Sequence, residues 1–320
     1  MRKHIVVIIG VGNLGARYLQ GLIKISLNLD IICVDPSKTS LDYAQSLIVE
    51  EEGLHLLRKI RFLTSYPTYL NYIDLVIVAT SSNVRLKIIE KAVECSRVRY
   101  WILEKVLVQS LVDLNKLRKL LNNSESAWVN TSRRSMSWYK NIKKMFNLQK
   151  PLNFVFQGNG WGIACNSIHF IDLVSWWTGE TIVNIDTEGL DTVWYESKRL
   201  GYYDVIGKLA AKFSGNSSLE LIDKVNVKNP PILFINSYDK KGEVHEQNGY
   251  AKNFDGTKIF GNIEFQSTST CRLVENILKF GNCDLPTFLE SFHQHKIFIP
   301  AMLDHWNRQQ KHTVTSVPIT

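Results

Sequence analysis

The stretch His4-Ile5-Val6-Val7-Ile8-Ile9-Gly10-Val11-Gly12-Asn13-Leu14-Gly15 decides the fold of this chain. Its five apolar residues 5–9 are typical of a parallel strand that is buried on both faces. The three glycines that follow have the G-x-G-x-x-G spacing of a turn that binds a diphosphate. Gly10 would make the tight turn, Gly12 would let backbone N–H groups approach the diphosphate, and Gly15 would let the next helix pack closely. We therefore predict a dinucleotide-binding turn between a strand and a helix.

The next apolar run, residues 31–34, ends in Asp35, twenty residues after Gly15. An acidic residue at this distance holds a ribose 2′-hydroxyl in dinucleotide-binding units. Because a carboxylate repels a 2′-phosphate, Asp35 favours NAD as the cofactor, while the nearby Ser37 and Lys38 leave NADP open. The alternative is a glycine turn that arose by chance in an ordinary α/β unit.

Short apolar runs alternate with longer amphipathic stretches over the first 125 residues, and this rhythm predicts a doubly wound parallel sheet, the Rossmann fold. A helix is predicted at residues 111–121, where the leucines form one stripe. Strands are predicted at residues 5–9, 31–34, 61–63, 75–79, 100–103 and 127–130.

The rhythm changes after about residue 130, and this half of the chain predicts an α+β domain. Turns at residues 214–217 and 239–242 separate β-like segments between about residues 181 and 266, which indicates a mainly antiparallel sheet. A further strand is predicted at residues 152–156, and helices at residues 166–177, closed by Gly179, and 285–309.

Length and composition agree with two domains. The 320 residues are 45% hydrophobic and 21% charged, as in globular proteins, and a domain has roughly 150 residues. The apolar run after Met1 stops at Gly10, so we interpret it as a strand and not as a signal peptide. Five widely spaced cysteines without a CxxC argue against a disulfide framework and a zinc site. We predict a dinucleotide-binding domain at residues 1–125, a substrate-binding domain at 126–320, no metal, no membrane span and a cytoplasmic location.

The formal net charge of +8 is not accompanied by a Lys/Arg run, zinc-finger spacing or an aromatic RNA-binding signature, so we do not expect nucleic acid as a partner. One segment is locally basic. Residues 133–150 contain six Lys or Arg and no Asp or Glu. This segment is either a solvated basic face or an anion subsite, in which Arg133 or Arg134 would bind a carboxylate or phosphate of the substrate.

Ligands of an open α/β sheet bind at the carboxyl ends of its strands, where the strand order reverses. Lys105 follows the predicted strand at residues 100–103. A lysine shielded from water near a nicotinamide would hold its proton less tightly and could polarise or deprotonate a substrate hydroxyl. The alternative is an exposed lysine at a strand end. To the cofactor we also assign residues of the glycine turn and of the strand ends, namely Asn13, Leu14, Thr80, Ser81 and Glu104.

A second cluster begins with Gly158-Asn159-Gly160-Trp161-Gly162 and continues into a predicted helix. Within that helix Cys165, Asn166, His169 and Asp172 share one face, because they are three or four residues apart. His169 could take up a hydroxyl proton near neutral pH, and Asn166 or Asp172 could orient it or a sugar hydroxyl. Trp161 is assigned to the substrate as well. The alternative is a capped helix with an interior histidine.

Together these segments resemble the Gfo/Idh/MocA family of NAD(P)-dependent sugar and cyclitol oxidoreductases over nearly the whole chain. Gly10–Gly15 matches the glycine-rich turn of the family, and Glu104-Lys105-Val106 matches its Glu-Lys-Pro motif in two of three positions. In the family's Asp-x-x-x-His pair, His169 matches and Cys165 stands in the Asp position. The resemblance implies Lys105 and His169 as the catalytic pair.

The departures from the family pattern affect both catalytic segments. Val106 in place of Pro removes the usual reason for a cis peptide after the lysine. Cys165 removes a charged partner of the histidine, for which Asn166 could partly substitute as a hydrogen-bonding group. The Cys-Asn-x-x-His-x-x-Asp variant and the Asn-x-x-Arg-Arg segment at residues 130–134 are most similar to family members of bacterial surface-polysaccharide pathways.

The resemblance implies a dehydrogenase that moves a hydride between nicotinamide and a hydroxyl-bearing carbon of a sugar or sugar derivative. It also implies a homodimer or homotetramer, formed through the outer face of the C-terminal sheet. The departures leave a second hypothesis open, a non-catalytic dinucleotide-binding sensor or assembly protein. A short-chain dehydrogenase using Tyr139 and Lys143 is rejected, because that class needs a different glycine spacing.

Overall fold

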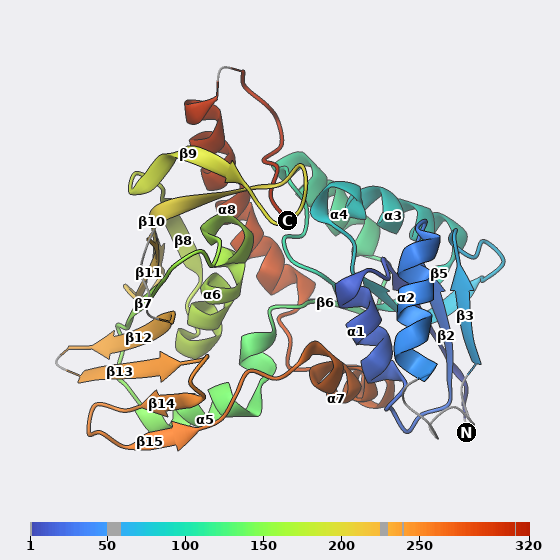
Figure 1. Cartoon of the computed structure of the whole chain (residues 1–320), viewed down its shortest axis with the longest axis horizontal. Coiled ribbons are helices and arrows are strands. Elements are labelled where there is room, and N and C mark those ends of the chain that lie inside the picture. Colours follow the sequence, from blue (N-terminus) through green and yellow to red (C-terminus); the bar gives the residue numbers. More distant parts are fainter. Residues whose placement is uncertain (1, 50–58, 225–229, 239, 311) are drawn as a thin grey trace. The chain divides into compact units, whose positions relative to one another are not determined.

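The structure is a computed structural model that describes residues 2–49, 59–224, 230–238, 240–310 and 312–320 (Figure 1). The chain forms two compact units. The first consists of Met1–Leu107, Asn115–Asn130 and Glu264–Phe288, and the second of Val108–Leu114, Thr131–Ile263 and Leu289–Thr320. These units are defined by packing; the division by role into residues 1–125 and 126–320 stays a prediction.

A six-stranded parallel sheet forms the centre of the first unit, in the order β3-β2-β1-β4-β5-β6. The order reverses between β1 and β4, as in doubly wound sheets, so the prediction of a Rossmann fold is confirmed. Each predicted strand overlaps an observed one. The strands are β1 His4–Ile9, β2 Leu29–Val34, β3 Lys59–Leu63, β4 Tyr72–Val78, β5 Arg97–Leu103 and β6 Ser126–Val129.

Helices follow the strands of this sheet. The predicted helix at Leu111–Leu121 is confirmed as α4. Helix α7 of this unit was not predicted from the sequence, and neither was α5 of the second unit. Helix α7 packs on α1, where a Cβ atom on Gly21 would lie only 2.5 Å from the carbonyl oxygen of Ser267. The other helices are α1 Asn13–Leu22, α2 Lys38–Val49, α3 Ser82–Cys95 and α7 Gln266–Phe280.

The second unit contains a nine-stranded sheet with the order β15-β14-β13-β12-β7-β11-β10-β8, and β9 pairs with β10. All pairs are antiparallel except β11 with β7, which confirms the predicted mainly antiparallel sheet. The strands are β7 Asn153–Gly158, β8 Ile182–Asp186, β9 Leu190–Glu196, β10 Tyr203–Phe213, β11 Ser218–Asp223, β12 Ile232–Ser237, β13 Lys240–His245, β14 Tyr250–Lys252 and β15 Lys258–Phe260.

One of the two predicted hairpin connections in this sheet is confirmed, and the other joins two antiparallel strands as expected but is predicted too late in the sequence, because Ser237 of β12 already pairs with Lys240 of β13. Residues 214–217 connect β10 with β11 as expected, but residues 240–242 already belong to β13, and Asp239 lies outside the described residues. Gly242 serves packing instead of a turn, because a Cβ atom there would lie 2.2 Å from the ring of Phe146.

Three helices and a short 3₁₀ helix complete the second unit. They are the 3₁₀ helix Ser132–Ser135, α5 Ser137–Phe146, α6 Ile163–Thr178 and α8 Phe288–Gln309, whose first residue belongs to the first unit. Helix α6 begins three residues before its predicted start at residue 166, and α8 begins three residues after its predicted start at residue 285. Gly179, with a φ of 74°, ends α6 as expected. Among the described helices none has the length and apolar character needed to cross a membrane.

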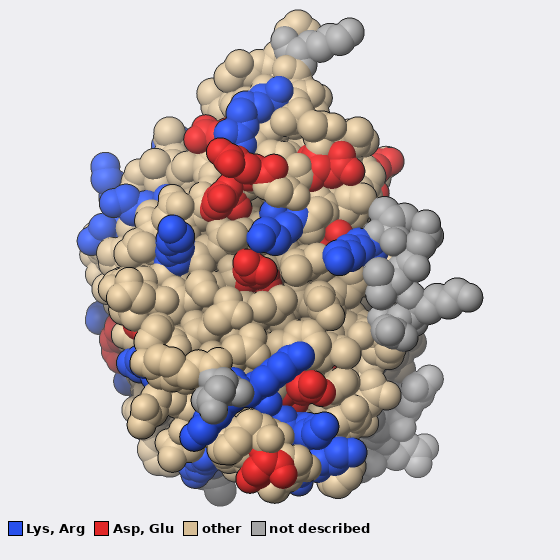
Figure 2. Space-filling view, turned by 90° about the vertical axis from the view of Figure 1, so that its left-hand side faces the viewer, with Lys and Arg blue, Asp and Glu red and all other residues tan. Residues whose placement is uncertain are grey.

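Acidic and basic side chains lie interspersed on the face shown in Figure 2. On the described part of this face, the net charge of +8 is therefore not gathered into a single broad basic patch.

We predict that Gly15→Ala destabilises the first unit. The added methyl group would lie 1.9 Å from the carbonyl oxygen of Gly10, so the backbone must move. Overpacking of this kind costs about 1–3 kcal/mol or more, and each kcal/mol lowers the thermal midpoint by about 2–4 °C in domains of 150–250 residues. Circular dichroism during heating measures the midpoint, with Gly12→Ala as the matched control. A midpoint unchanged in Gly15→Ala would show that the turn relaxes freely.

Candidate functional site

The glycine turn after β1 is held by Asp35. One carboxylate oxygen accepts the N–H of Val11 at 2.8 Å, and the other accepts the N–H of Ser37, also at 2.8 Å. Gly10 has a φ of 86°, which favours glycine. Apart from the neighbouring residues in the chain, no atom of the described residues lies within 4 Å of the position that a Cβ atom on Gly12 would take. Space is therefore left beside the turn, in front of the first helical residues Asn13 and Leu14.

Thr80 and Ser81 follow β4, and Ser81 precedes the first residue of α3. The methyl group of Thr80 packs near Gly10, since a Cβ on that glycine would lie 2.8 Å from it. The buried hydroxyl of Thr80 has no hydrogen-bond partner among the described residues. A buried polar atom without a partner is costly, so a ligand that supplied one would be favoured here.

Glu104, at the end of β5, contacts protein groups. Its buried carboxylate accepts the Tyr18 hydroxyl at 2.5 Å and the Asn130 side-chain amide at 2.7 Å. Burial, followed by the charge of Glu104, raises the pKa of Tyr18 well above its usual value. Asn130 also donates to the side chain of Gln266, on α7, at 2.9 Å. These contacts join β5 to α1 and α7, and a cofactor contact of Glu104 stays a prediction.

Lys105 is half-buried, and the peptide bond between Lys105 and Val106 is cis, although Val106 replaces the expected proline. The loop that carries Lys105 is bound by Arg85, a fully buried residue of α3 that was not predicted from the sequence. Its guanidinium donates to the carbonyl oxygens of Val106, Leu107 and Thr80. One side chain thus joins the segments that follow β4 and β5. Nothing in the local pattern distinguishes Arg85 from a surface arginine.

A cavity of about 350 Å³ lies within the second unit and brings together several of the predicted residues. Its lining includes Arg133, Phe156, Trp161, Asn166, His169 and Glu246. Cys165, Asp172 and Arg134 are not among the described lining residues. The thiol of Cys165 instead points toward the carbonyl oxygen of Tyr203, at 3.9 Å.

Two carboxylates position the loop that precedes α6. Asp223 accepts the backbone N–H groups of Gly160, Trp161 and Gly162 at 2.6, 3.1 and 3.1 Å. Asp204 accepts the N–H of Ala164 at 2.7 Å. Burial raises the pKa of both carboxyl groups, and these backbone hydrogen bonds oppose that rise. Neither residue was predicted as part of the site, because each lies on a strand distant in sequence from the loop.

Asn166 and Trp161 are fixed within this cluster. The Asn166 amide donates to the carbonyl oxygens of Trp161 and Gly162 at 2.6 and 3.1 Å, and the Trp161 indole donates to that of Ile222 at 3.0 Å. The Trp161 ring packs edge-on against Phe156, with centroids 4.9 Å apart. Aromatic side chains therefore form one wall of the cavity, close to His169.

Arg133 is paired with a protein carboxylate. Its Nε and one terminal nitrogen donate to the two oxygens of Glu246 at 2.7 and 3.0 Å, and its guanidinium stacks 4.4 Å from the centre of the Phe170 ring. Burial alone would raise the pKa of Glu246, but the charge of Arg133 and hydrogen bonds from Arg133 and Tyr139 lower it overall. The Tyr139 hydroxyl donates to Glu246 at 2.5 Å.

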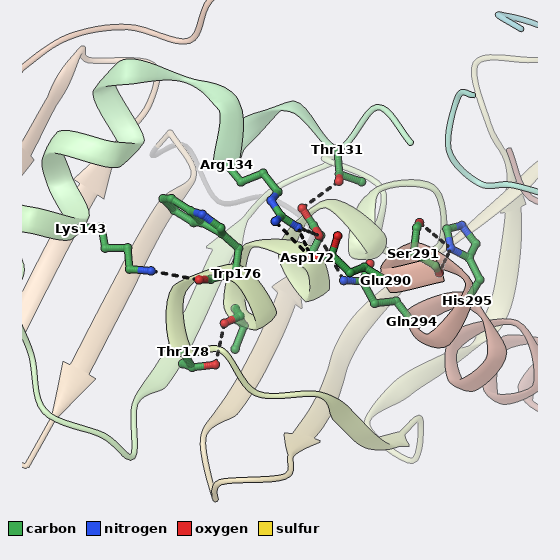
Figure 3. A network of polar contacts seen from close by, with 11 residues as sticks. Thr131, Arg134, Lys143, Asp172, Trp176, Thr178, Glu290, Ser291, Gln294 and His295 are labelled. Carbon is green, nitrogen blue, oxygen red and sulfur yellow. Dashed lines mark hydrogen bonds and ion pairs between the residues drawn. The ribbon is translucent and has the colours of Figure 1, made fainter. Parts of the chain in front are cut away.

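Asp172 and Arg134 belong to a separate polar network between α6 and α8 (Figure 3). The buried Asp172 carboxylate accepts from Thr131 at 2.8 Å, Gln294 at 3.1 Å and Arg134 at 3.3 Å. Arg134 also donates to Glu290 at 3.2 Å. Arg134 and Asp172 are both engaged with protein groups and are not among the described lining residues, so a substrate contact of either residue stays a prediction. Lys143 donates to the carbonyl oxygen of Trp176.

Comparisons with known proteins show the fold. No protein-family model matches the sequence, and no curated protein matches it either. Solved structures match over nearly the whole chain. A Gfo/Idh/MocA family oxidoreductase from Vibrio cholerae is 13% identical with a TM-score of 0.67, and 96% of this chain and 99% of that chain are covered.

Two further solved structures have the same fold. The myo-inositol 2-dehydrogenase from Lactobacillus plantarum is 16% identical, with a TM-score of 0.68 and coverage of 97% of this chain and 98% of that one. A super-repressor mutant of Gal80p from Saccharomyces cerevisiae is 13% identical, with a TM-score of 0.67 and coverage of 97% and 100%. The chain thus shares the fold of Gfo/Idh/MocA-type oxidoreductases, as its motifs predicted.

We predict that Asp172→Asn changes how stability depends on pH. Burial raises the pKa of Asp172, opposed by Arg134 and by hydrogen bonds from Gln294 and Thr131. The folded chain therefore binds this proton more tightly than the unfolded chain. The resulting stabilisation is complete below the unfolded pKa of about 3.9 and is lost as the pH rises through the folded pKa.

Asparagine does not titrate, so the stability of the parent relative to Asp172→Asn should fall as the pH rises from 4 toward neutral. Urea unfolding at a series of pH values measures the difference. Glu290→Gln, which removes the exposed partner of Arg134 but keeps Asp172, serves as control and should retain the parent's slope. A difference that instead grows toward neutral pH would mean that pairing with Arg134 outweighs burial.

Proposed function

We propose that this chain is an oxidoreductase that uses a nicotinamide dinucleotide, with NAD preferred over NADP, and acts on a hydroxyl-bearing carbon of a sugar or sugar derivative. The glycine turn carries the proposal. Gly12 faces open space, Thr80 has a buried hydroxyl to be satisfied, and the Asp35 carboxylate stands at the end of β2, all in a parallel sheet whose order reverses beside β1.

The residues present fit a dinucleotide. The turn at Gly10–Gly15 and the start of α1 would hold the diphosphate through backbone N–H groups, and Asp35 would accept a ribose hydroxyl. Thr80 and Ser81 lie on the neighbouring segment. When bound, the nicotinamide gives up or takes a hydride.

The chain's own residues would handle the substrate hydroxyl. Lys105, whose loop is held by Arg85, can donate a hydrogen bond to that oxygen and hold its proton. His169, in the cavity of the second unit, can take up or release the proton near neutral pH. Trp161 and Asn166 line the same cavity and would position a ring with hydroxyl groups.

Finer assignments extend this proposal. The segment similarity to surface-polysaccharide enzymes suggests a sugar derivative of such a pathway as substrate, and analogy with the family suggests a homodimer or homotetramer. A non-catalytic sensor with the same fold is the second candidate; the likeness to Gal80p is compatible with it but does not favour it. Calorimetry with NADH and a screen of sugars separate the two, since a sensor would bind NADH without turnover.

We predict that Lys105→Ala slows the formation of NADH from NAD and sugar by about 10²–10⁴-fold, the usual contribution of a positioned acid or base. NADH affinity should stay close to that of the parent. Absorbance at the NADH band measures turnover, and Lys91→Ala, at an exposed position on α3, is the matched control. Turnover as fast as the parent's would reject Lys105 as catalytic.

We predict that Gly12→Ala weakens NADH binding without destabilising the fold. Its φ of −65° suits alanine, and within the described part of the chain the new methyl group would meet no atom beyond its chain neighbours. The methyl would instead occupy the space proposed for the diphosphate, and a cost of about 1.4 kcal/mol corresponds to a tenfold loss of affinity. Calorimetry measures affinity and heating measures stability. Unchanged affinity would place the dinucleotide elsewhere.

A further inference from the structure

Opposite charges meet in the wall of the cavity in the second unit. Arg133 and Glu246 are the fully charged residues among the described lining, and their side chains are only 18% and 14% exposed. Both oxygens of Glu246 are bound by the guanidinium, and Tyr139 donates to one of them as well. The pair therefore adds no net charge to the cavity.

This pairing determines what Arg133 can offer a ligand. Bidentate recognition of a carboxylate or phosphate needs two parallel N–H groups of one guanidinium. In Arg133, Nε and a terminal nitrogen are directed at Glu246, and the flat face rests on Phe170. Glu246 takes two of the five N–H groups of this guanidinium and neutralises its charge. An anion that reached the remaining N–H groups would therefore meet no net positive charge and would be repelled by the nearby carboxylate.

The rest of the lining suits an uncharged ring. Trp161 and Phe156 provide apolar surface, and Asn166, Gln247 and Ser132 provide groups that can hydrogen-bond to hydroxyls. A cavity of about 350 Å³ is within the range of small-molecule sites. Hydroxyl groups of a ring can bind the outer oxygens and nitrogens of a neutralised ion pair without the loss of hydration that a full charge suffers.

We propose that Glu246 determines the substrate class of this cavity: by neutralising Arg133 it selects uncharged sugars or cyclitols and excludes ligands that carry a carboxylate or phosphate. The proposal rests on the proposed function in taking this cavity as the substrate site. On this proposal Arg133 does not form the anion subsite that the sequence suggested. Glu246 acts in substrate selection and does not transfer a proton.

Binding of matched ligands to the full-length parent gives the first test. The pairs are glucose with glucuronate, galactose with galacturonate, and myo-inositol with inositol monophosphate, each measured by calorimetry at constant ionic strength. The parent should bind at least one uncharged member, at least tenfold more tightly than its anionic counterpart. A parent that binds no uncharged member, or binds the anions equally well, overturns the proposal whether or not any variant folds.

The variant Glu246→Gln gives the second test. Glutamine keeps the shape but frees the charge of Arg133, so the preference for the uncharged member should fall at least tenfold, and inorganic phosphate should raise the thermal midpoint of the variant more than that of the parent. Arg133→Gln combined with Glu246→Gln should lose this gain, because the described lining would then contain neither Lys nor Arg. An undiminished preference in Glu246→Gln would contradict the role of Glu246.

Glu290→Gln is the matched control. It removes a carboxylate partner of Arg134, which is not among the described cavity residues, so the preference among ligands should stay as in the parent. These measurements need no turnover. An inactive protein with a selective cavity would reject the dehydrogenase proposal and support this one, whereas activity confined to anionic sugars would do the reverse.

Discussion

The close approach of two backbone segments, at Gly10 and Gly15, is the constraint on which the first unit depends. No side chain fits at Gly15, since its Cβ would lie 1.9 Å from the oxygen of Gly10. The strand β1 can therefore turn directly into α1, which brings the N–H of Val11 to Asp35 and leaves Thr80 beside Gly10. Segments that follow β1, β2 and β4 meet at one edge of the sheet as a consequence, and that edge is where the physics of parallel sheets places a ligand.

In the second unit, the comparable constraint is that buried carboxylates need partners. A buried carboxylate is tolerated only when it is paired with a cation or well hydrogen-bonded. Asp223 accepts backbone N–H groups, Glu246 pairs with Arg133, and Asp172 pairs with Arg134. The basic segment at residues 133–150 is thus not simply a solvated cationic face. Its two arginines each pair with an acid from a distant part of the chain, Arg133 with Glu246 and Arg134 with Asp172.

Local patterns predicted the elements whose cause is local. The glycine spacing, the apolar runs of the parallel strands and the leucine stripe of α4 all follow from short-range periodicity. The hydrogen-bond partners of buried groups do not follow from such short-range patterns. Arg85, Asp204 and Asp223 act on segments far away in the sequence, and α7 contributes to the first unit from residues near the end of the chain. Gly242 is a further example, because it was interpreted as part of a turn. Its lack of a side chain instead leaves room for the ring of Phe146, which is distant in the sequence.

A fold shared by a myo-inositol dehydrogenase and by Gal80p does not itself decide whether a chain is catalytic, so the residues at positions 106 and 165, which depart from the family pattern, are informative. Val106 replaces a proline, yet Arg85 holds the carbonyl oxygens of Val106 and Leu107, and the loop that carries Lys105 has buried support of its own. Cys165 replaces an aspartate, yet it lies outside the described cavity lining that includes His169. Both departures therefore leave Lys105 and His169 in the chain, and the loop of Lys105 keeps the buried support of Arg85 even without a proline.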